Sequence, residues 1–346
     1  MKVAIVLGEV AGGVLAHVRS VAGGLIDTGH TVEVAAPAGV LDALAIDGVR
    51  RVPVRIGVRP DPRADAATVR LLRGLRDADV VHAHGVRAGA LTALARTGRP
   101  VVTTLHNAAP TTSGVHAAVF KLLLRVAVCS SAVVLSVSPD LDEPARRAGA
   151  RDVRRAVIAA PDDVVAAPIP HEGFRAVCVG RLTAQKRIDL LIDAATLVDD
   201  VRWSVVGDGP DRPSLQARID AGGAPVELLG RRDDVPRVLA AADVAVSTAA
   251  WEGQPVWLQE AVRAGLPVVA FDVGGIRETI GAAGVFVDFP HVEGIAGEVR
   301  RLAGDPAYRT SRGAQVRAVA ATLPTRRDEI DALIGLYESL TTLPMS

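Results

Sequence analysis

The chain has 346 residues, and its 39 basic and 39 acidic side chains give a formal net charge of zero. Apolar residues make up 49% of the sequence, which is typical of globular domains with large cores and excludes global disorder. Balanced charge and only 3% aromatic residues argue against nucleic acid as a partner, because its binding needs a basic surface or base-stacking side chains.

The first half of the chain alternates short apolar runs with helical periods. Between the runs, residues 14–25 and 64–76 are predicted to form helices. Nearly unbroken apolar strands that alternate with helices are typical of a parallel sheet covered on both faces. The predicted strands are 2–7, 31–36, 80–84, 101–106 and 132–137.

The most apolar stretch, residues 117–137, is too interrupted by polar residues for a membrane span. It predicts a buried helix that runs into a strand. Lys121 and Arg125 lie four residues apart, on one face of this helix, and we expect that face at the solvent edge. The alternative interpretation is weak peripheral contact with anionic lipid.

The compartment predicted from the sequence is the cytoplasm, with the inner face of the membrane as the alternative. The apolar run at 2–7 is too short for a signal peptide. Cys129 and Cys178 lie in separate apolar contexts and make neither a metal-binding spacing nor a disulfide framework.

The second half of the chain repeats the same alternation. Before it, residues 159–173 contain three prolines and no helical period, which predicts a linker. We therefore expect two doubly wound, Rossmann-like α/β domains, 1–168 and 169–324, that face each other across a cleft, with ligands at the carboxyl ends of the strands. A final helix, 325–346, is expected to pack back on the first domain. The predicted strands are 174–180, 201–207, 226–230, 244–248, 267–271 and 284–288.

Glycines and cations follow the first strand of each predicted domain. Gly12 and Gly13 open a helix, where their amides can face an anion or merely form a tight turn. Arg181 and Lys186 follow the strand 174–180, and two cations near a helix start suit a diphosphate. For Lys186, the alternative is an ion pair with Asp189.

Two glutamates lie eight residues apart in the segment WEGQPVWLQEAV. Glu252 is predicted in a loop and Glu260 in the following helix, so the two carboxylates could contact different parts of one elongated ligand. Carboxylates accept hydrogen bonds from vicinal hydroxyls such as those of a sugar or a ribose. The alternative for Glu260 is a surface helix charge, although apolar neighbours favour partial burial.

Three histidines lie at or near the ends of predicted strands. His106 ends the strand 101–106, at the edge where a ligand is expected. His82 and His84 alternate on the strand 80–84 and resemble a metal-binding pair. No third ligand accompanies this pair in the sequence, so no metal site is predicted.

The ordered motifs GG…H, GRL-x3-K, VVGDGP, EG-x-P-x4-EA and PVVA-x-D-VGG-x-x-E resemble those of the retaining GT-B glycosyltransferases of family 4. The resemblance covers nearly the whole chain and implies that Arg181 and Lys186 hold the donor diphosphate. It further implies that Glu260 contacts the ribose and that Gly13 brings an amide to the phosphate. His106 would lie near the reacting carbon of the donor. The donor sugar would meet Glu252 and the backbone of Gly253, Gln254, Pro255 and Val256.

The resemblance implies transfer of a hexosyl unit from a nucleoside diphosphate sugar, UDP before GDP, to a hydroxyl of a glycan, lipid-linked or small-molecule acceptor. No cofactor is expected, and donor binding is expected to be independent of metal. Other activities share such folds. The alternatives are a sugar-nucleotide epimerase and a non-catalytic nucleotide-sugar-binding subunit. A phosphorylase is disfavoured because Lys186, the only well-placed lysine for pyridoxal, is assigned to the diphosphate.

Overall fold

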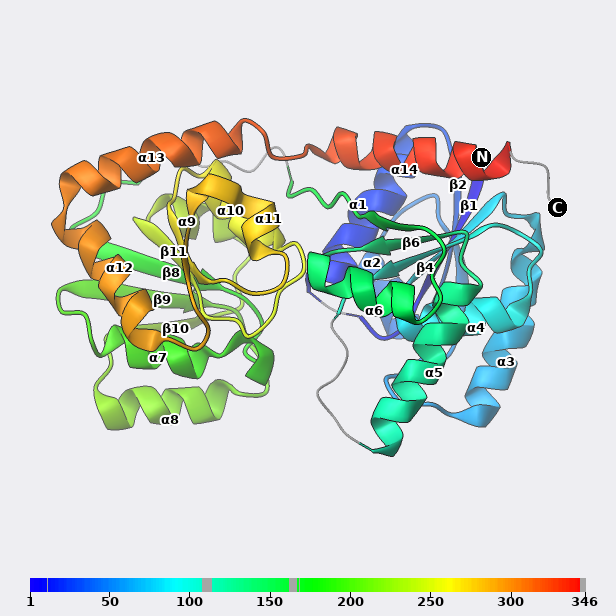
Figure 1. Ribbon diagram of the computed structural model, residues 1–346, viewed down its shortest axis with the longest axis horizontal. Helices are drawn as coiled ribbons and strands as arrows, with labels where there is room; N and C mark the ends of the chain where they lie inside the picture. Colours follow the sequence, from blue (N-terminus) through cyan, green and yellow to red (C-terminus); the bar gives the residue numbers. More distant parts are fainter. Residues whose placement is uncertain (11, 108–113, 162–166, 168, 343–346) are drawn as a thin grey trace. The chain divides into compact units, whose positions relative to one another are not determined.

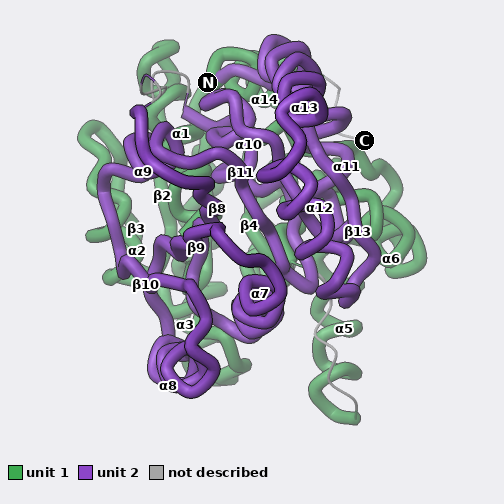
Figure 2. The backbone as a smooth tube through the Cα atoms, turned by 90° about the vertical axis from the view of Figure 1, so that its left-hand side faces the viewer, with its two compact units in different colours: residues 1–158, 326–346 green, residues 159–325 purple. Residues whose placement is uncertain are grey.

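The computed structural model describes residues 1–10, 12–107, 114–161, 167 and 169–342 (Figure 1). Two compact units make up the chain (Figure 2). Unit 1 contains residues 1–158 and 326–346, and unit 2 contains residues 159–325. The predicted boundary, near residue 168, lies ten residues after the point where the chain leaves unit 1.

Unit 1 is built on a seven-stranded parallel sheet with the strand order β3-β2-β1-β4-β5-β6-β7. Its inner strands are almost completely buried, and most of their residues are Val, Ile, Ala and Leu. The strands are β1 (Lys2–Leu7), β2 (Thr31–Ala36), β3 (Arg50–Pro53), β4 (Val80–His84), β5 (Val101–Leu105), β6 (Val133–Ser136) and β7 (Val153–Arg155).

Helices cover both faces of this sheet. On one face, α3 and α4 pack against alternate residues of β1 and β4. The opposite face of β4 carries His82, which meets the C-terminal helix α14. The helices of unit 1 are α1 (Gly13–Asp27), α2 (Ala38–Leu44), α3 (Pro62–Leu72), α4 (Val86–Ala95), α5 (Val115–Cys129), α6 (Asp142–Arg147) and α14 (Arg326–Thr341), with short 3-10 turns η1 (Arg73–Asp77) and η2 (Pro139–Leu141).

The last helix, α14, packs on α1 although some 300 residues separate them in sequence. Gly24 of α1 permits this close approach. A Cβ atom at Gly24 would lie 2.5 Å from Cγ1 of Ile330, which is closer than real side chains come. Ile330 is 3% exposed, so this side chain on the apolar face of α14 occupies the space beside Gly24.

Unit 2 has a six-stranded parallel sheet with the order β10-β9-β8-β11-β12-β13. One face is covered by α7, α8 and α12, and the other by α9, α10, α11 and α13. The strands are β8 (Phe174–Val179), β9 (Val201–Val206), β10 (Val226–Gly230), β11 (Val244–Ser247), β12 (Val268–Phe271) and β13 (Gly284–Val287). The helices are α7 (Ile188–Ala195), α8 (Arg212–Gly222), α9 (Val235–Ala240), α10 (Val256–Arg263), α11 (Ile276–Ile280), α12 (Val292–Gly304) and α13 (Pro306–Ala320), with 3-10 turns η3 (Ala184–Lys186) and η4 (Gly281–Ala283).

These two units confirm the predicted doubly wound α/β class. Two strands were not predicted, β3 and β7, and both lie at an edge of the first sheet. Their sequences, RRVP and VRR, lack the apolar runs that mark inner strands because an edge strand is partly exposed and tolerates charge. Of the predicted linker, residues 162–166 and 168 lie outside the described residues; the described remainder has neither helix nor strand.

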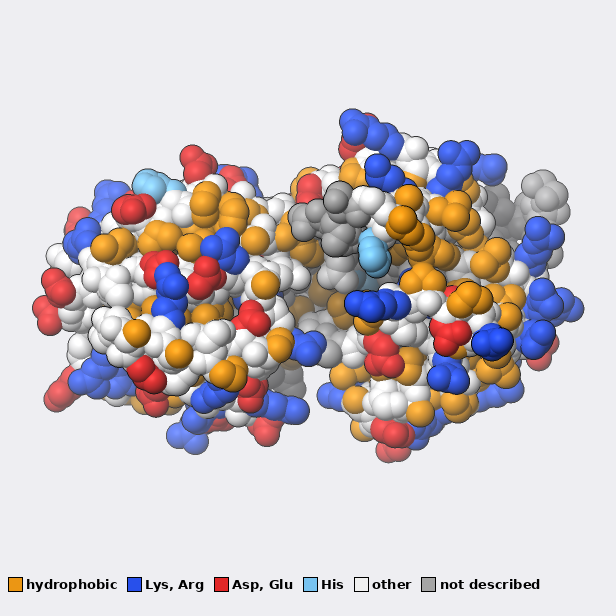
Figure 3. Space-filling model, turned by 90° about the horizontal axis from the view of Figure 1, so that it is seen from below, with side chains coloured by type: hydrophobic (Ala, Val, Ile, Leu, Met, Phe, Trp, Pro, Cys, Tyr) orange, Lys and Arg blue, Asp and Glu red, His pale blue; other side chains and the backbone are white. Residues whose placement is uncertain are grey.

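The stretch 117–137 forms α5 followed by β6. Leu124, Ala127 and Val128 of α5 are buried, while Lys121 and Arg125 are both exposed. Among the described residues, no helix combines the length and apolarity needed to cross a bilayer. On the described surface visible in Figure 3, basic and acidic side chains are interspersed.

Candidate functional site

Lys186 and Glu252 form an ion pair in unit 2, in the loops that follow β8 and β11. The Lys186 ammonium group donates to Oε1 of Glu252 across 66 residues of sequence. The Glu252 side chain is 9% exposed and that of Lys186 is 21% exposed. Asp189, the alternative partner, pairs with Arg187 instead. The fold therefore unites two residues that the sequence analysis assigned to one ligand.

Three hydrogen bonds hold these two loops together. The Gln185 side-chain amide donates to the carbonyl of Trp251 at 2.9 Å, and the Ala250 amide donates to the carbonyl of Gln185 at 2.9 Å. The Thr248 hydroxyl donates to the carbonyl of Arg187 at 2.9 Å. The position of the Lys186–Glu252 pair is thus fixed by the backbone on both sides.

A glycine turn after β12 contacts the backbone of the Glu252 loop. Gly274 has a φ of +55°, and a Cβ atom there would lie 2.0 Å from the carbonyl oxygen of Glu252. The next amide, Gly275, donates to that same oxygen at 2.9 Å. Any side chain at residue 274 would push the Glu252 loop away, which explains the VGG motif physically.

Arg181 directly follows β8 and Gly180, and it is exposed. Among the described residues, its guanidinium group has no hydrogen-bond or ion-pair partner. It can therefore bind an anion without breaking an existing interaction. A planar guanidinium group with five donors suits phosphate oxygens.

Glu260 lies one turn into α10 and is partly buried. Burial raises the pKa of its carboxyl group, and the nearby Arg263 acts in the opposite direction. Arg263 donates to the carbonyls of Ala160 and Pro324, and within the described part of the chain no donor reaches the Glu260 carboxylate. A partly buried acceptor of this kind is suited to a ligand with hydroxyl groups. The turn from Glu252 to α10 consists of Gly253, Gln254 and Pro255, and Val256 begins the helix.

Gly12 and Gly13 lie in unit 1, at the start of α1. Gly12 precedes the helix with a φ of +60°, and Gly13 is its first residue. A Cβ atom at either glycine would have no other atom within 4 Å. The first turn of α1 thus borders open space, where helix amides can receive an anion.

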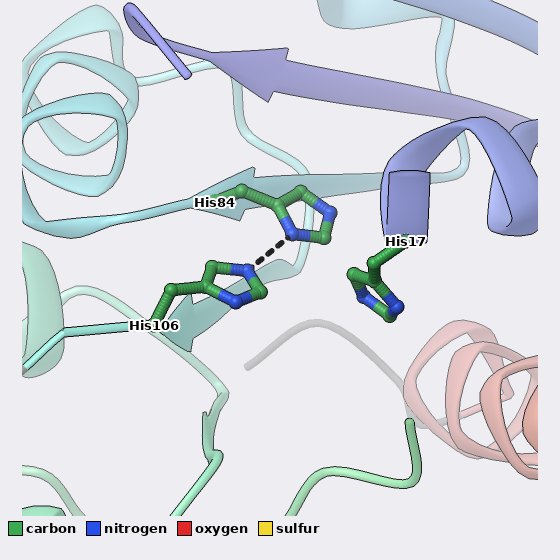
Figure 4. A group of neighbouring side chains, drawn as sticks. All are labelled: His17, His84 and His106. Atoms are coloured by element: carbon green, nitrogen blue, oxygen red, sulfur yellow. Dashed lines mark hydrogen bonds between the residues drawn. The ribbon is translucent and has the colours of Figure 1, made fainter. Parts of the chain in front are cut away.

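Four histidines of unit 1 form what we call the histidine cluster: His17, His82, His84 and His106. His84 ends β4 and His106 follows β5, and the Nδ1 atom of His84 lies 2.9 Å from Nε2 of His106. The ring of His17, on α1, lies 5.6 Å from the rings of both (Figure 4). His82 stacks on His84 with 4.2 Å between ring centroids.

Burial keeps most of this cluster uncharged. Burial, and to a smaller extent the neighbouring His17, lowers the pKa of His82 to about 3. The pKa values of His84 and His106 are well below the usual value, again mainly through burial and then through neighbouring histidines. These three imidazoles are therefore neutral near pH 7.

The C-terminal helix supplies polar partners to the cluster. Nδ1 of His17 donates to Oε1 of Glu329 at 2.8 Å. The Tyr337 hydroxyl lies 2.6 Å from Nδ1 of His82, whose Nε2 lies 2.7 Å from Oγ1 of Thr104. Glu329 and Tyr337 are both completely buried. Sequence reasoning missed both, although Glu329 shares a helix face with Leu333 and Tyr337, and an acid on an apolar face indicates a buried partner.

The predicted site residues thus divide between the units. Unit 1 holds Gly12, Gly13 and His106. Unit 2 holds Arg181 and Lys186 after β8, together with Glu252, Glu260 and the residues between them. Within unit 2, the structure joins Lys186 to Glu252 directly.

Two family descriptions match the chain. Residues 12–161 match "Glycosyl transferase 4-like domain", and residues 156–305 match "Glycosyl transferases group 1". The GDP-mannose-dependent alpha-mannosyltransferase of Mycobacterium tuberculosis (strain CDC 1551 / Oshkosh) is 30% identical over 328 residues, which are 85% of this chain and 83% of the relative. The chain belongs to the group 1 glycosyltransferase family.

Other proteins similar to this glycosyltransferase match a shorter part of the chain or have lower sequence identity. Alpha-D-kanosaminyltransferase of Streptomyces kanamyceticus is 28% identical over 176 residues, which are 47% of this chain and 45% of that relative. The crystal structure of Anabaena Alr3699/HepE in complex with UDP has a TM-score of 0.84 at 20% identity, covering 98% of this chain and 100% of that one. WaaG, a glycosyltransferase involved in lipopolysaccharide biosynthesis, has a TM-score of 0.75 at 17% identity, covering 99% and 100%. These structures confirm the GT-B fold.

Proposed function

We propose that the chain is a retaining glycosyltransferase that moves a hexosyl unit from a nucleoside diphosphate sugar to an acceptor hydroxyl. The main support is the constellation on unit 2, where Arg181 lies five residues before Lys186 and Lys186 pairs with Glu252. UDP is the first candidate nucleotide and GDP the second. A relative is named as GDP-mannose-dependent and a structural neighbour binds UDP.

The donor diphosphate is assigned to Arg181 and Lys186. An ammonium group has three N–H donors, so Lys186 can keep its contact with Glu252 and still donate to a phosphate. The second oxygen of Glu252 can accept from a sugar hydroxyl, with the backbone from Gly253 to Val256 beside it. Glu260 is assigned to the ribose hydroxyls because its half-buried carboxylate needs donors.

Catalysis then rests on stabilising the leaving group. When the glycosidic bond to the diphosphate breaks, negative charge grows on the phosphate oxygens, where preorganised cations and amides act. Gly13 is assigned to bring a helix amide to this phosphate. Because no protein carboxylate is assigned as a nucleophile, the departing phosphate accepts the acceptor's proton on the same face, and the configuration is retained. His106 is assigned a place near the reacting carbon.

The test is incubation of the full chain with a panel of UDP and GDP sugars, with and without a cell-envelope lipid extract. Mass spectrometry should detect a product heavier by one hexosyl unit, and NMR should show the donor's anomeric configuration in it. Release of an epimerised nucleotide sugar would instead support the epimerase. Donor binding without hydrolysis or transfer would support the non-catalytic subunit.

A nucleoside diphosphate sugar should raise the melting temperature of the protein without added metal. Arg181, Lys186 and helix amides already supply the positive charge that Mg²⁺ would otherwise provide. Differential scanning fluorimetry with and without chelator measures this effect. A donor-induced shift that disappears with chelator would contradict the metal-independent assignment.

Vesicle binding tests the alternative that α5 contacts anionic lipid. Its exposed Lys121 and Arg125 would contribute only ~1 kcal/mol each near an acidic surface, too little for stable anchoring. Any co-sedimentation should therefore be confined to low salt and acidic lipid, and it should disappear in the Lys121→Glu/Arg125→Glu variant. Equal pelleting with neutral vesicles or at high salt would exclude this electrostatic contact.

A further inference from the structure

Three members of the histidine cluster bring potential metal ligands together from three elements. His17 comes from α1, His84 from the end of β4 and His106 from the residue after β5. One ring nitrogen from each lies within 4.8 Å of the others (Figure 4). In sequence they are 67 and 22 residues apart, so no motif of the usual spacing reveals them.

The orientation of His17 is set by a buried carboxylate. Its Nδ1 donates to Glu329 at 2.8 Å, and the Ser20 hydroxyl donates to the other oxygen of Glu329 at 3.4 Å. With Nδ1 protonated, the Nε2 atom of His17 carries the free lone pair. A carboxylate that accepts from the second nitrogen is the usual support of a metal-ligating histidine.

His84 contributes an independent observation. Its side chain is buried, and its Nε2 atom has no hydrogen-bond partner among the described residues. Its Nδ1 atom is directed at Nε2 of His106. Stacking on His82, which Tyr337 and Thr104 hold by both nitrogens, fixes the plane of the His84 ring. With the ring proton on Nε2, Nδ1 of His84 has its lone pair free to ligate an ion together with Nε2 of His106.

We propose that His17, His84 and His106 bind one divalent transition-metal ion, with Zn²⁺ as the best match. Three imidazoles and one open position for water form a common zinc coordination set. Zinc–nitrogen bonds of about 2.0–2.1 Å place tetrahedral ligand atoms roughly 3.3 Å apart. The 2.9 Å between Nδ1 of His84 and Nε2 of His106 is already near this spacing, and His17 offers a third ring nitrogen within 4.8 Å of the other two.

The functional consequence rests on the proposed function, which assigns His106 to the donor. A metal ion would occupy the imidazole that the reaction uses. Zn²⁺ should therefore inhibit glycosyl transfer when it fills this site, and a chelator should restore the activity. Donor binding by unit 2 does not need the ion.

The site can be tested by calorimetric titration of the chelator-treated full chain with Zn²⁺. We expect one ion per chain, and Co²⁺ in its place should show the visible absorption of a tetrahedral complex. His17→Gln and His84→Gln should each weaken binding at least as much as Glu329→Gln, for which loss of the supporting carboxylate predicts about a 10-fold decrease or more. His116→Gln is the matched control, since His116 is an exposed histidine of the same unit.

Circular dichroism establishes that each variant is folded before titration. The proposal is overturned if no stoichiometric ion binds, or if folded His17 and His84 variants bind Zn²⁺ as tightly as the unaltered chain. An equal loss in the His116 variant would also overturn it, since it would indicate nonspecific binding. Because binding is measured directly, absence of transferase activity would contradict the proposed function and leave the metal site standing.

Discussion

Alanine at Arg181 or at Lys186 is expected to weaken binding of a nucleoside diphosphate by about 1.5–3 kcal/mol each, the usual contribution of a charged hydrogen bond. Arg181→Ala is the cleaner variant. Its side chain is exposed and makes no pair within the described residues, so its loss should not alter stability. Isothermal titration with UDP and GDP, compared with UMP and GMP, measures the effect on the second phosphate.

Lys186→Ala needs an additional variant because it leaves the buried Glu252 carboxylate without its cation. The double variant Lys186→Ala/Glu252→Gln removes that uncompensated charge and should recover stability without recovering diphosphate affinity. Arg202→Ala provides a matched control, since Arg202 is an exposed arginine near the start of β9. Unchanged diphosphate affinity in both single variants would place the diphosphate elsewhere.

The two glutamates should separate the nucleotide half of the donor from its sugar half. Glu260→Gln should weaken binding of free nucleotide, because its assigned partners are the ribose hydroxyls. Glu252→Gln should leave nucleotide affinity intact, because the assigned partner of Glu252 is the donor sugar. Lys186 loses its carboxylate partner in this variant but can still bind the diphosphate. It should lower transfer by about 10- to 150-fold, which corresponds to 1.5–3 kcal/mol.

The pH dependence of nucleotide binding gives a second measurement for Glu260. Burial raises the pKa of this carboxyl group, and hydroxyl donors bind its ionised form. Affinity should therefore be full at higher pH and fall as the pH decreases through this raised pKa. Glu260→Gln should remove that decrease. Equal loss of nucleotide affinity in both glutamate variants would contradict the division of roles.

The sequence predicted the inner strands well because burial on both faces demands continuous apolar runs. It missed β3 and β7, whose exposed edges admit arginine. The pair formed by Lys186 and Glu252 depends on loop contacts over 66 residues, so the sequence could indicate only a shared ligand.

The histidine cluster was the least predictable part of the candidate site. His82 and His84 were recognised as a pair, but the sequence indicated no third ligand for them. His17 comes from α1, His106 follows β5, and Glu329 comes from α14, far along the chain. Such convergence follows from parallel strand order and from helix packing, which local patterns do not encode.

Because α14 belongs to unit 1, the fold of that unit can be completed only after nearly the whole chain has been synthesised. A ribosome finishes residues 1–158 long before it reaches Glu329 and Tyr337, whereas residues 159–325 emerge as one continuous stretch. Until the last helix appears, His17 lacks Glu329, His82 lacks Tyr337, and the surface of α1 at Gly24 lacks Ile330. Unit 2 can thus fold first, although its sequence is translated later. An isolated first unit would need residues 326–342 joined to Ile158 through a new linker.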